Sequence, residues 1–308
     1  MRRLFLLLAA VFLLLPHAST ADTDLICATC GKEIRGDFVE VGNDVYHPDH
    51  LECARCGNVL TEDYFIHQGR PYHAACLNQD ESATRCALCG EVIWLEHEVD
   101  FWGNAYHRDH AEEVDRCPYC FRYISPSVSQ GGYRYPDGRN ICGICFESAV
   151  LRPTQVDSLK EEVQDQLREA GIEVDGSEVP VFLVDRGDLV AFPGADSTLS
   201  GFTRYELAGT ASASRTTIEI FILGGLPRMF FIAVLAHELT HAWQYSLGRF
   251  DMEPALLEGS CNYASYLVLE RYEGEEARYE RMSLGKNEHP LYGEGFRRVQ
   301  ALTEERGV

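Results

Sequence analysis

Residues 230–243 read FFIAVLAHELTHAW, and this stretch decides how the rest of the chain is interpreted. On a helix, His237 and His241 lie four residues apart and share one face, about 40° apart around the axis. Two imidazoles in that arrangement can hold a zinc ion, and Glu238 beside them can act as general base. The apolar run before the motif favours a helix that begins near Pro227 or Arg228 and crosses the core.

Glu258 follows His241 by seventeen residues, in the string Leu-Leu-Glu-Gly-Ser-Cys. This spacing allows a turn and a second helix over 252–270, so Glu258 is predicted to be the third protein ligand of the zinc. Three protein ligands leave one position open for water, as a catalytic zinc requires. The pattern therefore predicts a zinc metallopeptidase. The alternative is a metal-free helix whose histidines are satisfied in the core.

Other residues near the motif are candidates for supporting roles. The oxyanion formed during peptide hydrolysis needs a hydrogen-bond donor besides the metal, and the candidates are Tyr263, Tyr266 and Arg228. Cys261 comes three residues after Glu258, on the same side of the predicted helix. It either packs that helix or ligates or regulates the metal, and packing is favoured.

Twelve cysteines are present, and eleven of them alternate with histidines in eight pairs, each with two residues between its members. The pairs are Cys27 and Cys30, His47 and His50, Cys53 and Cys56, His73 and Cys76, Cys86 and Cys89, His107 and His110, Cys117 and Cys120, and Cys142 and Cys145. A disulfide framework has no reason to place histidine in these slots. Eleven cysteines and five histidines make sixteen ligands, enough for about four tetrahedral structural zinc ions.

The first of these pairs resemble a LIM domain, a tandem double zinc finger. His47-Pro48-Asp49-His50 is similar to the His-Pro-x-Cys string of that family, and 69–73 to its Gly-Lys-Pro-Tyr-Cys string, with histidine replacing cysteine. The resemblance implies one zinc for each consecutive set of four ligands. It implies a LIM domain at 25–80 and a LIM-like module at 84–150, although six residues separate His110 from Cys117. LIM domains usually bind proteins, so a protein partner is expected.

The C-terminal part resembles the DA-one-like LIM peptidases. The resemblance is carried by 221–228, 235–243, 257–262 and 292–297. It implies an α+β chain: tandem LIM and LIM-like zinc-finger modules, then a mainly helical zincin-like metallopeptidase domain of the gluzincin type, with a small β-sheet, at 151–308. It also implies that His237, His241 and Glu258 bind one catalytic zinc and that Glu238 is the base.

The N-terminus predicts export. Arg2 and Arg3 precede an apolar stretch of twelve residues, too short for the roughly twenty-residue span of a bilayer, so 1–21 is predicted to be a signal peptide. A secreted or periplasmic protein follows, without a stable membrane span after cleavage. Plant members of the resembled family are activated through ubiquitin, whereas this chain is similar to an exported bacterial-type relative. The formal net charge of −21 disfavours nucleic acid as a partner.

The remaining pattern predicts helices at 156–170 and 292–307, strands at 179–184 and 216–223, and loops around short strands over 191–209. The strand at 216–223 either pairs with an extended substrate or lies buried in the sheet. Two functional alternatives stay open. One is a zinc-stabilised interaction adaptor with an inactive peptidase-like domain, and the other is an enzyme that its fingers inhibit. The substrate and the oligomeric state are not predicted.

Overall fold

The computed structural model describes residues 25–61, 63–94, 96–174, 179–192, 197–210, 213–249 and 251–306. The predicted signal peptide, 1–21, lies outside these ranges. The chain divides into two compact units, Met1–Ala83 and Thr84–Val308. The second unit contains both the predicted LIM-like module and the predicted peptidase domain. Within the described ranges, no helix has both the length and the hydrophobicity that a membrane span requires.

The first unit is built from short hairpins that follow zinc-knuckle turns. Its elements are β1 (Val39–Val41), β2 (Asp44–Tyr46), η1 (Pro48–His50), β3 (Phe65–His67), β4 (Arg70–Tyr72) and α1 (Ala74–Leu77). The strands pair antiparallel as β1 with β2 and β3 with β4. In each knuckle the residue after the second cysteine has a positive φ, 67° at Gly31 and 70° at Gly57, a conformation that glycine adopts without steric cost.

The LIM-like module repeats this plan in the second unit. Its elements are β5 (His97–Val99), β6 (Ala105–His107), η2 (Arg108–Glu112), α2 (Pro126–Ser129), β7 (Gly132–Arg134), β8 (Asn140–Cys142), α3 (Gly143–Glu147) and β9 (Ala149–Val150). The hairpins again pair as β5 with β6 and β7 with β8. The six residues between His110 and Cys117 therefore lengthen the connection between the two halves without changing the fold of either half.

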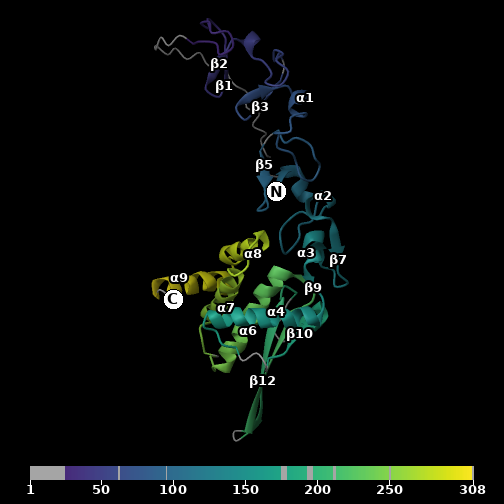
Figure 1. Cartoon of the computed structure of the whole chain (residues 1–308), viewed down its shortest axis with the longest axis vertical. Helices are drawn as coiled ribbons and strands as arrows, with labels where there is room; N and C mark the ends of the chain where they lie inside the picture. Colours follow the sequence, from purple (N-terminus) through teal and green to yellow (C-terminus); the bar gives the residue numbers. More distant parts are fainter. Residues whose placement is uncertain are drawn as a thin grey trace, which may run out of the picture. The chain divides into compact units, whose positions relative to one another are not determined.

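The rest of the second unit combines a small sheet with a helical layer (Figure 1). Its elements are α4 (Pro153–Glu169), β10 (Val181–Val184), α5 (Arg186–Val190), β11 (Gly201–Thr210), β12 (Ala213–Leu223), β13 (Leu226–Pro227), α6 (Arg228–Ser246), α7 (Pro254–Leu269), α8 (Glu275–Lys286), η4 (Pro290–Glu294) and α9 (Gly295–Arg306). The predicted helix of the HExxH motif is confirmed as α6, and the predicted second helix as α7.

The sheet has the order β10-β12-β11, with β10 parallel and β11 antiparallel to β12. Ile220 and Ile222 of β12 are fully buried. Residues 220–222 of the predicted strand lie between β10 and β11, so here the strand is central and its alternative role in pairing with substrate is wrong; residues 216–219 pair with β11 alone. The expectation of loops with short strands over 191–209 is also wrong in part, since β11 is a ten-residue strand.

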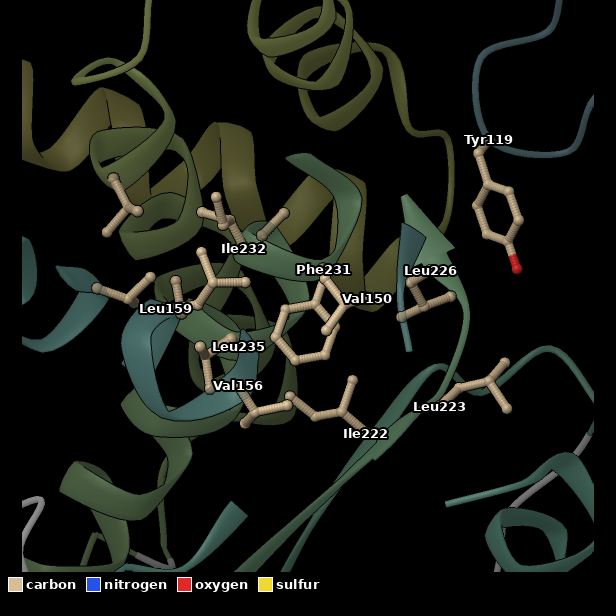
Figure 2. Packing of buried hydrophobic residues seen from close by; sticks show 14 of the residues in the cluster. Tyr119, Val150, Val156, Leu159, Ile222, Leu223, Leu226, Phe231, Ile232 and Leu235 are labelled. Atoms are coloured by element: carbon tan, nitrogen blue, oxygen red, sulfur yellow. The ribbon is translucent and has the colours of Figure 1, made fainter. Parts of the chain in front are cut away.

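A single hydrophobic core joins α6 to the sheet, to α4 and to the LIM-like module. Figure 2 shows part of it, with Phe231 of α6 near Val150 of β9 and Ile222 of β12. Because α6 is buried on most of its circumference, its apolar residues run continuously instead of following one stripe. β9 pairs antiparallel with β13, which leads directly into α6. The module is thereby fixed to the first turn of the metal helix.

Candidate metallopeptidase active site and zinc clusters

Four clusters of cysteine and histidine ligands are assembled, and each contains the four residues that the LIM resemblance implies. In a tetrahedral zinc site the ligand atoms should lie about 3.3 Å apart for nitrogens and about 3.8 Å apart for sulfurs. The sulfur of Cys30 lies 3.6 Å from Nδ1 of His47, the two Nδ1 atoms of His47 and His50 are 3.1 Å apart, and the sulfurs of Cys120 and Cys142 are 3.6 Å apart. These distances fit zinc without rearrangement, and the clusters together with the LIM domain indicate zinc binding.

In each cluster the pKa of the first cysteine is lowered, whereas the pKa values of Cys76, Cys89, Cys120 and Cys145 are raised. Burial alone would raise the pKa of Cys27, but hydrogen bonds from the backbone around His47 and Cys30 outweigh it and lower the pKa to about 5. In the fourth cluster, hydrogen bonds from the Cys120, Cys142 and Cys145 thiols hold the pKa of Cys117 far below its usual range. Since the thiolate is the form that binds metal, the surroundings of these first cysteines favour the metal-bound state.

The fourth cluster differs from the others because it is part of the large core. All four of its cysteines are buried and pack in the same hydrophobic cluster as α4, β12 and α6. Around it, Tyr135 donates a hydrogen bond to the carbonyl of Gly225 at 2.9 Å, and Arg139 donates to that of Gly224 at 2.9 Å. The ring of Tyr119 lies 5.1 Å from that of Phe230. This cluster therefore supports the loop that leads into α6.

A fifth group of side chains that could hold a metal ion is formed by α6 and α7. The Nε2 atoms of His237 and His241 are 3.1 Å apart, and Oε2 of Glu258 lies 3.2 and 3.3 Å from them. Every edge of this triangle has the length expected for ligands of one zinc ion, about 3.3 Å. The sequence prediction that Glu258 reaches the two histidines from a second helix agrees with this arrangement.

Hydrogen bonds fix which ring nitrogen faces the metal position. Asn262 donates through Nδ2 to the carbonyl of Tyr292 at 3.0 Å, so its Oδ1 faces Nδ1 of His237 at 2.9 Å. Gln244 donates through Nε2 to Ser260, and its Oε1 lies 3.0 Å from Nδ1 of His241. Both Nδ1 atoms are assigned as donors, which leaves both Nε2 atoms as lone-pair acceptors. Gln244 and Asn262 were not identified from the sequence. Gln244 follows His241 by three residues on α6, and Asn262 follows Glu258 by four residues on α7.

Three acceptors therefore face one another without a donor between them. Oε2 of Glu258 is buried and has no hydrogen-bond partner among the described residues. Without a metal, protonated imidazoles would have to supply the missing donors, and as cations they would hold the pKa of Glu258 well below its usual range although burial opposes its ionisation. Burial likewise opposes the charged form of His241, but Cys261 and Glu258 raise its pKa well above the usual value. The site stabilises positive charge at this point, and a divalent zinc ion fits these residues.

Cys261 lies close to the site on the opposite side of the imidazole. Its sulfur is 3.4 Å from Nδ1 of His241, the nitrogen that faces away from the metal position. The side chain is fully buried, and burial raises the pKa of the thiol. The thiol packs behind the ring of His241, and its sulfur also lies within 4.8 Å of a ring nitrogen of His237, so both its packing role and its ligand role stay proposals.

Glu238 is held beside the metal position by β11. Its side chain is 6% exposed, and Thr203 donates a hydrogen bond to Oε2 at 2.6 Å. At Gly201 an added Cβ would come within 2.6 Å of Oε1 of Glu238 and 2.7 Å of Val234. The backbone of β11 thus passes directly over the carboxylate, which explains why small residues stand here. Neither Gly201 nor Thr203 was identified from the sequence.

Replacing Gly201 with alanine is expected to displace Glu238 and to lower kcat about a hundredfold or more, because displacements near 1 Å at reacting groups have effects of that size. Zinc content should not change, since the three ligand residues do not contact Gly201. The matched control is Gly285→Ala, where an added Cβ meets nothing within 4 Å. Parental turnover by the Gly201→Ala variant would show that β11 does not position Glu238.

Glycines also bring the remaining wall of the site close to α7. An added Cβ at Gly259 would lie 2.2 Å from the backbone of Gly295, so α7 and the start of α9 touch backbone to backbone. This contact explains the glycine directly after Glu258. It also places η4 next to the site, where the ring of Tyr292 lies 6.1 Å from that of His237.

A cleft of about 340 Å³ opens over these residues, lined among others by Ser200, Gly201, His237, Glu238 and Tyr292. The three predicted oxyanion donors do not line it. Arg228 is paired with Glu162 at 3.1 Å. Tyr263 accepts a hydrogen bond from Thr303 at 3.0 Å, and Tyr266 stacks beside Tyr263. They point elsewhere because they occupy other faces of α6 and α7, and Tyr292 is the tyrosine that faces the cleft.

Comparison with known proteins relates the chain to one group of plant proteins. Residues 27–81 match the LIM domain family, and residues 198–284 match the DA1-like family, described as Protein DA1. Over 80% of this chain it is 27% identical to Protein DA1-related 2 of Arabidopsis thaliana, and over 95% it is 26% identical to Protein DA1 of the same plant. The alignments cover 53% and 67% of those two proteins. The chain thus spans about half to two thirds of the length of the curated relatives that it matches.

Proposed function

We propose that the chain, with its N-terminal LIM domain and its DA1-like region, is a zinc-dependent endopeptidase. The observation that carries the proposal is the triangle of acceptor atoms on His237, His241 and Glu258, with edges of 3.1 to 3.3 Å, beside the buried Glu238. Three protein ligands, a neighbouring carboxylate and an open cleft are the parts that hydrolysis by activated water requires.

In this proposal the protein residues divide the chemistry among them. When bound, a zinc ion would supply a Lewis acid that polarises the scissile carbonyl and acidifies a water molecule. Glu238 accepts the proton of the attacking water and delivers it to the leaving amine. Thr203 orients the carboxylate through its 2.6 Å hydrogen bond. Tyr292 replaces the three earlier candidates for stabilising the oxyanion, because it lines the cleft.

The sheet offers a way to bind the substrate backbone. β11 stands at the end of the three-stranded sheet, so β12 covers only one of its two edges. Its first residue, Gly201, also lines the cleft next to Glu238. An extended peptide can add to such an edge through main-chain hydrogen bonds, which position the scissile bond without demanding particular side chains.

The test is hydrolysis of casein and of a library of internally quenched peptides by the purified full-length protein. We expect cleavage that disappears after dialysis against a chelator and returns with zinc. Absence of cleavage in the zinc-loaded protein would contradict the proposal. It would favour the alternative, a zinc-stabilised adaptor that binds proteins through its LIM domain. Export of the protein is a further part of the proposal, and it rests on the sequence of residues 1–21.

A further inference from the structure

Three cavities follow one another in the second unit. The catalytic cleft shares Phe230 and Glu280 with a cavity of about 380 Å³ between the LIM-like module and the first turn of α6. That cavity shares Trp102 and Tyr279 with a third one of about 580 Å³, which reaches Phe121. Because neighbouring cavities share lining residues, they lie side by side from the metal position toward the surface of the module. We call this row of three cavities the module groove.

Aromatic side chains line the module groove. The indole of Trp102 stacks on Tyr279 with ring centroids 5.2 Å apart, and Phe101 meets the same tyrosine edge to face at 5.2 Å. Tyr119 and Phe230 form the wall toward the catalytic cleft, 5.1 Å apart. Flat aromatic walls of this kind accept apolar side chains and extended backbone.

Phe121 at the outer end of the module groove is held in an unfavourable backbone conformation. It follows the second cysteine of the fourth knuckle and has a φ of 60°, where the other three knuckles have glycine. Its side chain is nevertheless 57% exposed, next to Val99 at 60%. A bulky residue in this conformation costs energy that glycine would avoid, and the contact of its ring with the Arg116 guanidinium, 4.7 Å from the ring centre, still leaves most of the side chain exposed. Strained, exposed aromatic residues are typical of binding surfaces.

The walls of the central cavity carry more carboxyl groups than cations, and of its two arginines Arg228 is already paired with Glu162 at 3.1 Å. Glu147 and Glu273 are exposed and form no ion pair within the described ranges, and Glu276 reaches Arg122 only at 4.0 Å. Burial raises the pKa of Glu280 to about 8, so this carboxyl adds little charge at neutral pH. The side chain of Arg122 is 10% exposed, lies 3.3 Å over the ring of Trp102, and its Nη1 finds no acceptor among the described residues. The cavity therefore offers acidic groups to a cationic side chain and one buried donor to a carbonyl.

We propose that the module groove binds an extended segment of the substrate protein, in which an apolar residue is flanked by lysine or arginine. The apolar residue would lie between Trp102 and Phe230, the cations near Glu147 and Glu273, and a backbone carbonyl at Arg122. This inference rests on the proposed peptidase function and names its substrate class. Phe230 precedes His237 by seven residues of α6, or about 10 Å, so the apolar residue lies about three positions from the scissile bond.

The test measures binding without turnover. Two fluorescent peptides of about a dozen residues share a Trp-Leu centre, flanked in one by lysines and in the other by glutamates. Their affinity for the zinc-loaded, full-length Glu238→Gln variant is measured by fluorescence anisotropy. We expect the lysine peptide to bind about tenfold more tightly than the glutamate peptide. Adding Phe121→Gly should weaken its binding about fivefold or more, and adding Glu147→Gln with Glu273→Gln should reduce the difference between the peptides.

Matched controls distinguish binding in the module groove from non-specific binding, from dimer formation and from the peptidase proposal. Leu302 on α9 is also exposed, at 42%, but lies outside the module groove, so Leu302→Ala should leave binding unchanged. Glycine at position 121 should not lower the unfolding temperature, since it relieves the positive φ. Equal binding of the two peptides, or binding that Phe121→Gly does not alter, would overturn the inference. So would a dimer that this substitution makes monomeric, because the module groove would then hold a second copy. Since hydrolysis is not measured, binding by a protein that never cleaves peptides would refute only the peptidase proposal.

Discussion

Replacing Glu238 with glutamine is expected to lower kcat by about a thousandfold or more and to leave the zinc content unchanged. General base catalysis contributes about a hundred- to ten-thousandfold, and an amide cannot accept the proton of the attacking water. Glutamine has the shape of glutamate, and its carbonyl can accept the 2.6 Å hydrogen bond of Thr203. The measurement is steady-state cleavage of the best quenched peptide, with zinc determined on the same sample.

The matched control is Glu304→Gln, an equivalent substitution on the exposed side of α9. It should leave both the turnover and the zinc content at parental values. If Glu238→Gln cleaves peptides at the parental rate, Glu238 is not the base and the proposed mechanism fails. If both variants keep the parental turnover, the cleavage is due to a different catalytic group or to a contaminating peptidase.

Replacing Cys145 with serine is expected to destabilise the whole second unit. The loss of one thiolate removes the zinc of the fourth cluster, and structural zinc sites contribute about 10 kcal/mol or more to folding. Because this cluster packs in the same core as α4, β12 and α6, the loss reaches the catalytic helix. We expect the unfolding temperature of the second unit to fall by about 10 °C or more in differential scanning calorimetry, with peptide cleavage lost in parallel.

Cys53→Ser provides the comparison, since Cys53 is buried in a cluster of the first unit. That variant should also lose one zinc ion but keep the unfolding temperature of the second unit. Equal effects of Cys145→Ser and Cys53→Ser on the second unit would mean that the fourth cluster is a separate finger. The shared core would then contribute little to the stability of the catalytic helix.

The grouping of His237, His241 and Glu258 could be predicted because two of them are spaced by one helical turn and the third follows on the next helix. His237 and His241 share a face at any position of the helix in the core, and Glu258 needs only a second helix that packs against α6. The four-ligand zinc clusters could be predicted for a similar reason. Two residues between ligands define a knuckle locally, and cysteine and histidine in equivalent slots exclude a disulfide framework.

β11 could not be predicted because some of its residues are determined by their tertiary contact with Glu238 and not by strand propensity. Gly201 is a weak strand signal, and although Thr203 is typical of strands, both stand in a segment rich in glycine, serine and threonine, which normally indicates turns. Glycine is present at 201 because Glu238 leaves no space there for a Cβ, and threonine is present at 203 because its hydroxyl donates a hydrogen bond to the Glu238 carboxylate. Tertiary packing therefore overrides the local composition at the residues that touch the catalytic carboxylate.

The contact of the LIM-like module with the proposed peptidase domain could not be predicted from sequence patterns either. In the structure α4 begins at Pro153, with Arg152 as its N-terminal cap, almost directly after β9. The decisive contact is the pairing of Val150 with Leu226, residues far apart in the chain. The oxyanion donors were misplaced for the same reason, since spacing alone does not tell which tyrosine faces the cleft. Tyr292 reaches it because Gly259 and Gly295 allow α7 and α9 to touch.

The most direct measurement is the zinc content per chain of the purified protein, compared between the parent and the His237→Ala, His241→Ala double variant. Four clusters of cysteine and histidine and one site on α6 and α7 predict about five zinc ions in the parent and about four in the variant. The variant should remain folded, because its structural clusters are intact. The same count in both proteins would mean that the HExxH histidines hold no metal, and the assignment of a catalytic zinc site would be contradicted.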